Sequence, residues 1–332
     1  MPLEDYDWLA REELLSFEEI ARLARLFLPL GVEKIRLTGG EPLLRKDLEG
    51  LIEQLASLQG LRDLALTTNG SGLEARAVGL RAAGLKRINI SLDSLRPERF
   101  AQITKRGRLD EVLRGVGAAK AAGLEPVKLN AVIIRGVNDD EIIDLVEFAR
   151  QSSVGLRFIE YMDVGNANDW SASRMVPESE ILAKVRKHYK LTGASTDDLT
   201  DGGTLTERGR QGGHAPAVDY VFGSTNEAGR VHAAEDVLGV IGSVSKPFCG
   251  SCTRARLTAD GKLVTCLFAS DDFDLKGPLR SGASDSELTE IIRGVWTQRS
   301  DRYSEERLAA LENGGDYKPG RVQKIEMIRL GG

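Results

Sequence analysis

Apolar and polar positions along the first half of the chain predict helices and strands in alternation. Ser16 and Glu19 form a capping box, and the helical stripe of apolar residues behind it ends at Gly31. A strand is predicted over 32–38, followed by a helix from about Asp47. Strands that alternate with helices across short connections predict a parallel sheet, and hence an α/β fold. The further strand patterns of this series lie over 64–67, 86–91, 127–133 and 155–161.

The pattern changes after Met162, where a loop leaves this alternation. Residues 192–213 are rich in Gly, Thr and Asp and poor in apolar side chains, which predicts a mobile surface insertion. His214, at the end of this stretch, is interpreted as a solvated surface residue and not as a ligand. Two strands are predicted over 218–222 and 238–244, and helices over 178–189, 287–296 and 305–312.

Polar residues follow the carboxyl ends of the predicted strands, which in a barrel meet at the catalytic mouth. Glycines at the first of these ends let the backbone approach a ligand closely. Arg36 and Lys128 lie inside strand patterns, where a buried cation needs an anionic partner. Since no G-x-G-x-x-G or Walker pattern follows the first strand, a Rossmann or kinase fold is disfavoured. The polar strand ends are 38–41, 67–69, 91–93, Asn130 and 160–162.

All three cysteines of the chain fall in one motif, C-x2-C-x13-C, formed by Cys249, Cys252 and Cys266. Three thiolates suit an iron–sulfur cluster or zinc, which are the metals that select soft ligands. A closed zinc site needs a fourth Cys or His, and the nearest histidine, His232, lies outside the motif. The residues alone leave the cluster and zinc about equally favoured, with cysteines that merely pack as a third interpretation.

The hairpin inside this motif can be closed in two ways. A two-residue Asp-Gly turn would set Cys266 opposite Ala255, whereas a three-residue loop with Gly261 in the left-handed region sets it opposite Arg254. We predict the three-residue loop. Arg254 and Arg256 alternate along the predicted strand, so both are expected on the same face as Cys252.

Composition narrows the function classes without selecting one. The 332 residues carry 41% hydrophobic and 29% charged side chains, as in an ordinary globular enzyme. A net charge of −5 argues against nucleic-acid binding, and three cysteines do not make a disulfide framework. No apolar run reaches the length that spans a membrane, and no signal peptide opens the chain, so we expect a cytoplasmic protein without membrane contact.

These features together resemble the MoaA-type GTP 3′,8-cyclases, which are radical S-adenosylmethionine (SAM) enzymes that start molybdenum-cofactor biosynthesis. The resemblance covers essentially the whole chain and is most specific at 34–42 (KIRLTGGEP), at 248–256 (FCGSCTRAR) with Cys266, and at the terminal Gly331-Gly332. It implies an incomplete (βα)6 TIM-like barrel over 1–163 and a smaller C-terminal region over 164–332. It also implies a homodimer whose product passes to a cyclic pyranopterin monophosphate synthase.

The resemblance also assigns roles to individual residues. Cys249, Cys252 and Cys266 would hold an auxiliary 4Fe–4S cluster whose open iron position contacts the guanine of GTP. The reaction would convert GTP to 3′,8-cyclo-7,8-dihydroguanosine triphosphate with SAM. The residues expected to bind SAM are Gly40, Ser91 and Met162, and those expected to bind GTP are Arg36, Thr67, Lys128, Arg254 and Arg256.

The chain departs from the family pattern at the first cluster. Radical SAM enzymes hold that 4Fe–4S cluster with C-x3-C-x2-C, and the sequence has no such cysteines. In the family the last of these cysteines is commonly followed by Met-Pro, which is how the chain begins, so we expect that Met1-Pro2 follows a missing segment. Five barrel strands can be counted, the first strand of the family's barrel is expected to be absent, and the strand over 32–38 is expected to be an edge that favours irregular association. The chain as written is expected to be inactive.

Three rival interpretations stay open. The first is a catalytically dead nucleotide-binding iron–sulfur paralogue without the SAM cluster. The second is a peptide-modifying radical SAM relative, although such relatives carry many more C-terminal cysteines. The third is a structural zinc protein.

Overall fold

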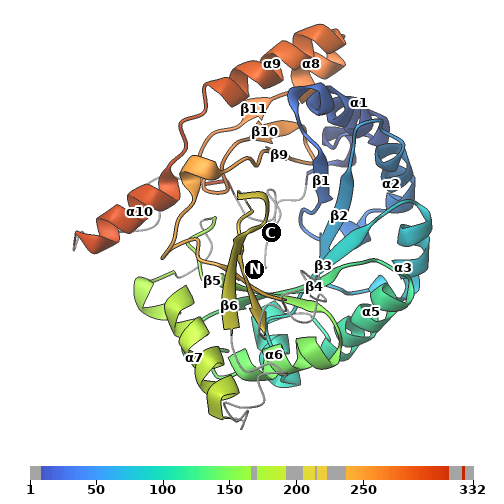
Figure 1. Cartoon of the computed structure of the whole chain (residues 1–332). Coiled ribbons are helices and arrows are strands. Elements are labelled where there is room, and N and C mark those ends of the chain that lie inside the picture. The colour runs from blue at the N-terminus through green and yellow to red at the C-terminus, as the bar shows by residue number, and fades with distance from the viewer. Residues whose placement is uncertain are drawn as a thin grey trace, which may run out of the picture.

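One mixed sheet forms the centre of the fold in the computed structural model (Figure 1). The structure describes residues 9–105, 107–165, 170–191, 205–213, 215–222, 237–313 and 324–325. Within these ranges the sheet has eight strands in the order β1-β2-β3-β4-β5-β8-β7-β6. Its strands are β1 (Lys34–Leu37), β2 (Asp63–Thr68), β3 (Arg87–Ser91), β4 (Val127–Ile133), β5 (Gly155–Glu160), β6 (Leu205–Arg210), β7 (Val218–Phe222) and β8 (Val237–Ile241).

Helices cover the outer side of this curved sheet, as Figure 1 shows for α2, α3, α5 and α6. The α-helices are α1 (Phe17–Phe27), α2 (Leu48–Ala56), α3 (Leu73–Ala82), α4 (Pro97–Thr104), α5 (Leu109–Ala121), α6 (Ile142–Gln151), α7 (Glu178–Leu191), α8 (Lys276–Arg280), α9 (Asp285–Thr297) and α10 (Tyr303–Glu312). The 3₁₀ helices are η1 (Arg11–Glu13), η2 (Leu28–Leu30), η3 (Pro42–Leu44), η4 (Ala172–Arg174), η5 (Gln211–Gly213) and η7 (Cys249–Ser251).

The sequence explains the first elements directly. Ser16 accepts a hydrogen bond from the Glu19 backbone amide, and the Glu19 side chain accepts one from the Ser16 amide, so the predicted capping box is confirmed. The chain turns away after α1 at Gly31, whose φ of 93° is left-handed. The alternation of α-helices with strands β1 to β5 confirms the predicted parallel α/β unit.

The count of five parallel strands proved one too low. β8 pairs in parallel with β5, with Leu156 opposite Leu238, so a sixth parallel strand comes from the C-terminal half of the chain. Local pattern could not reveal this because β8 is preceded in the chain by β7, which pairs antiparallel to it. In the part of the chain that the structure describes, β1 pairs only with β2, so its expected edge position is confirmed.

The predicted surface insertion over 192–213 is wrong from residue 205 onward. Leu205–Arg210 forms β6, which pairs antiparallel to β7 at the end of the sheet, with a bulge between Glu207 and Gly209. An edge strand needs only one packed face, which explains why a stretch poor in apolar residues can still be a strand. Residues 192–204 and His214 lie outside the described residues.

A second layer closes one end of the barrel. It is a three-stranded sheet of β9 (Arg256–Leu257), β10 (Lys262–Val264) and β11 (Phe273–Asp274), which lies beside α8 and α9 in Figure 1. A separate apolar core joins it to the start of the chain, because Leu15 and Leu23 pack in one cluster with Leu263 and Leu288. Arg22 of α1 also donates to Asp285 of α9 at 2.8 Å. The first helix thus anchors the C-terminal region to the barrel.

The hairpin between β9 and β10 has the predicted register. Leu257 lies opposite Leu263 and Arg256 opposite Val264, and the Thr258 amide donates to the Lys262 carbonyl at 2.9 Å. Three residues therefore form the loop, and Gly261 at its end has a φ of 80°. Continued by two residues, this register sets Cys266 opposite Arg254.

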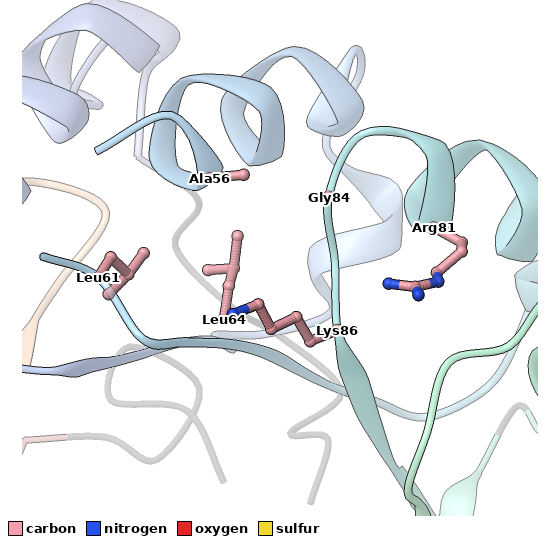
Figure 2. Close-up of a pocket in the computed structure, with 6 residues that line it drawn as sticks. All are labelled: Ala56, Leu61, Leu64, Arg81, Gly84 and Lys86. Atoms are coloured by element: carbon pink, nitrogen blue, oxygen red, sulfur yellow. The ribbon is translucent and has the colours of Figure 1, made fainter. Parts of the chain in front are cut away.

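A small pocket of about 310 Å³ lies where β2 and β3 begin, away from the strand ends that carry the predicted chemistry. Figure 2 shows the six residues that line it, among them Arg81 and Lys86. Both cations are used structurally, since Lys86 Nζ donates to the Arg62 carbonyl at 2.6 Å and Arg81 to the Leu85 carbonyl at 3.3 Å. A Cβ at Gly84 would lie 2.6 Å from that of Ala56, so the loop requires glycine there. This end of the barrel is built for packing.

No helix among the described residues is both long enough and apolar enough to cross a membrane.

Candidate functional site

A cavity of about 3120 Å³ opens at the carboxyl ends of the parallel strands and extends to the cysteine motif. Side chains from the barrel and from the C-terminal region line it together. Of the described residues that were predicted to bind SAM, GTP or a cluster, only Lys128 does not line it. Those that line it are Arg36, Gly40, Thr67, Ser91, Met162, Cys249, Cys252, Arg254, Arg256 and Cys266.

The Gly-Gly-Glu-Pro loop after β1 is fixed by its glutamate. Glu41 accepts hydrogen bonds from the Leu43 amide at 3.0 Å and the Thr68 hydroxyl at 2.7 Å, and its other oxygen accepts from the Asn69 amide at 2.7 Å. Gly39 has a φ of 135°, a conformation that only glycine adopts readily. The carboxylate therefore ties this loop to the end of β2, and the backbone around Gly40 is left facing the cavity.

The end of β5 is tied to the segment that leads into the cysteine motif. Glu160 is fully buried and accepts backbone hydrogen bonds from Glu178, Val244 and Ser245 at 2.8 to 2.9 Å, together with one from the Ser245 hydroxyl. A buried carboxylate with four donors holds its surroundings firmly. Met162 follows two residues later on the cavity wall.

Four cations gather on neighbouring barrel strands: Arg36 on β1, Arg87 on β3, Lys128 on β4 and Arg157 on β5. Arg87 pairs with Asp63, with Nε 2.8 Å from Oδ1, whereas Arg36 donates from Nη1 to the Thr67 hydroxyl at 3.0 Å. The position of Arg36 inside a strand pattern predicted a buried side chain. In the structure this side chain is exposed to the cavity.

The surroundings of Lys128 and Arg36 lower the pKa values of both side chains. Burial, reinforced by the charge of Arg157, lowers the pKa of Lys128 to about 8, and Asp219 on β7 acts in the opposite direction. Desolvation by the protein that surrounds the cavity, to which the Arg36 side chain is exposed, and the charges of Arg87 and Arg157 lower the pKa of Arg36 to about 10. Four cations with two carboxylates nearby leave an excess of positive charge, which favours an anionic ligand.

Several buried polar atoms beside these cations have no hydrogen-bond partner among the described residues. They are Arg157 Nε, Asn89 Oδ1, Asn130 Oδ1 and Asp219 Oδ1. Buried polar groups are normally paired, so such a row indicates a place for a polar ligand. Sequence reasoning missed Arg157 and Asn89. Strand alternation could have identified both residues, because Asn89 lies two positions before Ser91 and Arg157 two positions before Ile159, on the same face of their strands. In the sheet, Asn89 lies opposite Lys128 and Arg157 lies opposite Asn130.

The cysteine site lies at the other side of the cavity. Cys249 begins the short helix η7, and the Cys252 amide donates to the Cys249 carbonyl at 3.1 Å. All three cysteines are free thiols that are partly buried. Burial acts to raise the pKa of Cys252, but the charge of Arg254 and its hydrogen bonds outweigh burial, so this pKa is lowered. Burial raises the pKa of Cys266, whose Sγ accepts the Phe268 amide at 3.4 Å.

Two arginines approach the thiols as expected, but not along a continuous strand. β9 begins only at Arg256, so the predicted alternation from Cys252 onward is wrong before that residue. Arg254 instead lies over the ring of Phe248, 5.0 Å from its centre. Burial, together with the charge of Arg254, lowers the pKa of Arg256 to about 10. Residues 252–255, between η7 and β9, form no regular secondary structure, while both guanidinium groups still reach the cavity.

The donor set of three cysteine thiols fits an iron–sulfur cluster. Among the described residues, no three His, Cys, Asp or Glu side chains are placed to hold one metal ion together. A 4Fe–4S cluster binds each thiolate at a different iron, so its ligands need not converge on one point. Three thiols on one cavity wall suit such a group. His232, Met1-Pro2 and Gly331-Gly332 lie outside the described residues.

Comparison with known proteins agrees with this architecture. Residues 7–149 match the model of the radical SAM superfamily, and residues 154–305 match that of the Molybdenum Cofactor Synthesis C family. A GTP 3′,8-cyclase of Acidothermus cellulolyticus is 43% identical over 348 aligned residues, which cover 99% of this chain and 89% of the relative.

Two further relatives carry the same name. GTP 3′,8-cyclase 1 of Mycobacterium tuberculosis H37Rv is 42% identical, and the match covers 95% of this chain and 82% of the relative. GTP 3′,8-cyclase of Aquifex aeolicus is 42% identical, and the match covers 100% of this chain and 91% of the relative. At such identity over nearly the whole length, the chain belongs to the GTP 3′,8-cyclase family of radical SAM enzymes.

Proposed function

We propose that the protein is a GTP 3′,8-cyclase that converts GTP to 3′,8-cyclo-7,8-dihydroguanosine triphosphate with SAM, the first step of molybdenum-cofactor biosynthesis. One observation carries this proposal. A single cavity joins a cluster of lumen cations, which suits a triphosphate, to a three-thiol site, which suits an iron–sulfur cluster. The relatives are named GTP 3′,8-cyclases, and GTP has both an anionic triphosphate and a base.

In this proposal GTP spans the cavity. Its triphosphate lies against Arg36 and Thr67 in the lumen, with Arg157 as a further donor, and Lys128, which does not line the cavity, adds its positive charge from β4. The positive excess there and the unpartnered Arg157 Nε support this placement. Arg254 and Arg256 bind GTP near the thiols and fix its orientation between the two sites.

SAM would bind at the strand ends near Gly40, Ser91 and Met162, which line the same cavity. The Glu41 hydrogen bonds hold the loop that carries Gly40, and the Glu160 hydrogen bonds hold the strand end that precedes Met162. Both anchors limit backbone movement, so these residues can bind without reorganising.

Cys249, Cys252 and Cys266 would hold the auxiliary 4Fe–4S cluster. When bound, such a cluster supplies an iron without a protein ligand, to which the guanine can bind. The lowered pKa of Cys252 favours the thiolate form that a metal needs. Arg254 thus acts both on the ligand thiol and on the substrate.

The residues present do not fit the first cluster of radical SAM chemistry, because the sequence has no cysteines beyond these three. No step through that cluster is therefore derived. We propose that these 332 residues bind GTP but by themselves neither cleave SAM nor cyclise GTP. The same observation favours a second candidate, a nucleotide-binding iron–sulfur protein without the SAM reaction. The homodimer, the division at residue 163 and the hand-over to a cyclic pyranopterin monophosphate synthase also remain predictions.

Anaerobic reconstitution followed by calorimetry with GTP tests the proposal. We expect about four irons per chain and binding of GTP to the reconstituted protein. One tightly held zinc with no iron, or iron with no GTP binding, would contradict it. Incubation with SAM and a reductant should release no 5′-deoxyadenosine, and release would contradict the assignment of inactivity to these residues alone.

A further inference from the structure

One short segment that is distant in the sequence contacts the three-thiol site. This α9–α10 segment comprises residues 299–305. It runs from the end of α9 into the first turn of α10. Its side chains form hydrogen bonds at or beside each of the three cysteines, which lie at least 33 residues earlier in the chain: to Cys252 itself, to Gly250 next to Cys249, and to Thr265 next to Cys266.

The first two contacts hold the loop that carries Cys249 and Cys252. Arg299 donates from Nη2 to the backbone carbonyl of Cys252 at 2.5 Å, and its guanidinium stacks over Trp296, 4.2 Å from the ring centre. Glu305 Oε1 accepts the amide of Gly250, next to Cys249, at 3.1 Å. Stacking on Trp296 fixes the direction of the guanidinium, so that it points at the loop.

The third contact holds the residues that follow β10 and lead to Cys266. The hydroxyl of Thr265 donates to Asp301 Oδ2 at 2.6 Å. Beyond it, the ring of Phe268 stacks on Tyr303 with centroids 4.6 Å apart and planes 15° from parallel. The two halves of the cysteine motif are thus held against one support.

The segment also brings opposite charges to different thiols. Arg299 places its positive charge against the backbone carbonyl of Cys252, and Asp301 places its negative charge against the hydroxyl of Thr265, next to Cys266. Groups around a cluster that carry charge or donate hydrogen bonds tune its reduction potential. A cation stabilises the reduced, more negative form, and an anion destabilises it.

We infer that Arg299, Asp301 and Glu305 are positioning residues that hold the three cysteines in register and that Arg299 and Asp301 set the reduction potential of the cluster in opposite directions. This inference rests on the proposed function only in assuming that the cysteines hold a cluster. It assigns the α9–α10 segment a role in the redox step of the site, beyond packing.

The test is a redox titration of the anaerobically reconstituted chain, followed by optical and electron paramagnetic resonance spectroscopy. Arg299→Gln should shift the potential to more negative values, and Asp301→Asn should shift it to more positive values. Arg299→Lys keeps the charge and should lie closer to the parent than Arg299→Gln does. Glu305→Ala, which removes the acceptor of the Gly250 amide, should release iron to a chelator faster, by about tenfold or more.

Matched controls come from an exposed pair on the outer side of the barrel. Arg108 and Asp110 form a surface ion pair at 3.0 Å, so Arg108→Gln and Asp110→Asn make the same chemical changes away from the site. Both should leave the potential and the rate of iron loss unchanged. Thermal unfolding of each variant without iron identifies any that fails to fold, and the remaining charge variant then decides the sign of the effect.

The outcomes separate the two claims. If the parent binds about four irons and the charge variants shift the potential in the same direction or not at all, the inference is wrong and the proposed function stands. If the parent binds no iron, both the cluster assignment and the inference are wrong. Opposite shifts, with unchanged controls, support the inference.

Discussion

Arg36 on β1 donates a hydrogen bond from Nη1 to the Thr67 hydroxyl on β2, with 3.0 Å between the two atoms. Both side chains face the cavity, and the arginine has no carboxylate within ion-pair distance among the described residues. A cation that is hydrogen-bonded to a neutral hydroxyl keeps most of its charge available to a ligand, because the nearby carboxylate of Asp63 is paired with Arg87. This relationship supports the assignment of the lumen to the triphosphate of GTP.

Lys128 gives the site a pH dependence. Burial lowers its pKa to about 8, so the free protein loses this charge as the pH rises through 8, well below the ordinary lysine range. The affinity for GTP should therefore be level below pH 7 and fall as the pH rises from about 8 to 9. Calorimetry across this range measures it, and Lys128→Arg, which stays charged, should give a flat profile. A fall of equal size in both proteins would exclude Lys128 as the cause.

Lys128 should also affect stability, and in the opposite direction to its effect on GTP affinity. Because the folded pKa lies below the unfolded value of about 10.4, the unfolded chain binds more protons between pH 8 and 10, and Lys128 opposes folding at neutral pH. Lys128→Met should raise the thermal midpoint of the ligand-free chain at pH 7 while it weakens GTP binding. The difference between variant and parent should shrink as the pH rises past 8. A lower midpoint together with weaker GTP binding would indicate a structural role for this lysine.

Arg254 should contribute directly to GTP affinity. Removal of one charge-assisted contact to a phosphate costs roughly 1.5–3 kcal/mol, or about ten- to a hundredfold in affinity. Arg254→Ala is expected to lose affinity on that scale in calorimetry. Arg108→Ala, which removes an exposed arginine of a surface ion pair, is the control. Equal affinities of Arg254→Ala and the control would show that the arginine does not contact GTP.

A buried ion pair links the end of β5 to α10 and should dominate the stability of the C-terminal region. Asp163 and Arg307 are fully buried and paired, and Lys324 Nζ lies 2.9 Å from Asp163 Oδ2. Asp163→Asn leaves two buried cations without their carboxylate, and should lower the free energy of unfolding by about 3–5 kcal/mol. Glu74→Gln removes the partner of the exposed Arg114 and should cost less than about 1 kcal/mol. Chemical denaturation compares the two, and similar losses would contradict the prediction.

The sequence predicted local structure well where one rule applied. The helix cap at Ser16, the strands over 127–133 and 218–222, and the loop at Gly261 were all predicted from residue type and spacing. Each depends on neighbours along the chain, such as a hydroxyl that caps a helix or a glycine at positive φ.

The misses concern relations between distant segments. β8 joins the barrel beside β5, and β6 pairs with β7, although nothing local distinguishes these strands from others. Arg157 was not predicted as a site residue, because its position in the site depends on its neighbours Asn130 and Gly239 on the two adjacent strands. The hydrogen bond from Arg299 to Cys252 joins residues 47 positions apart, and no pattern in the sequence predicts it. The expected missing strand and irregular association remain predictions.

The central claim is that GTP lies across one cavity, with its triphosphate in the lumen and its base at the three-thiol site. The most direct measurement is electron paramagnetic resonance of the reduced, reconstituted chain during titration with GTP. The spectrum of the cluster should change, with a midpoint equal to the Kd from calorimetry, and Lys128→Met should move both values together. If the chain holds about four irons and binds GTP while the spectrum stays unchanged, GTP does not reach the cysteine site and the account is wrong.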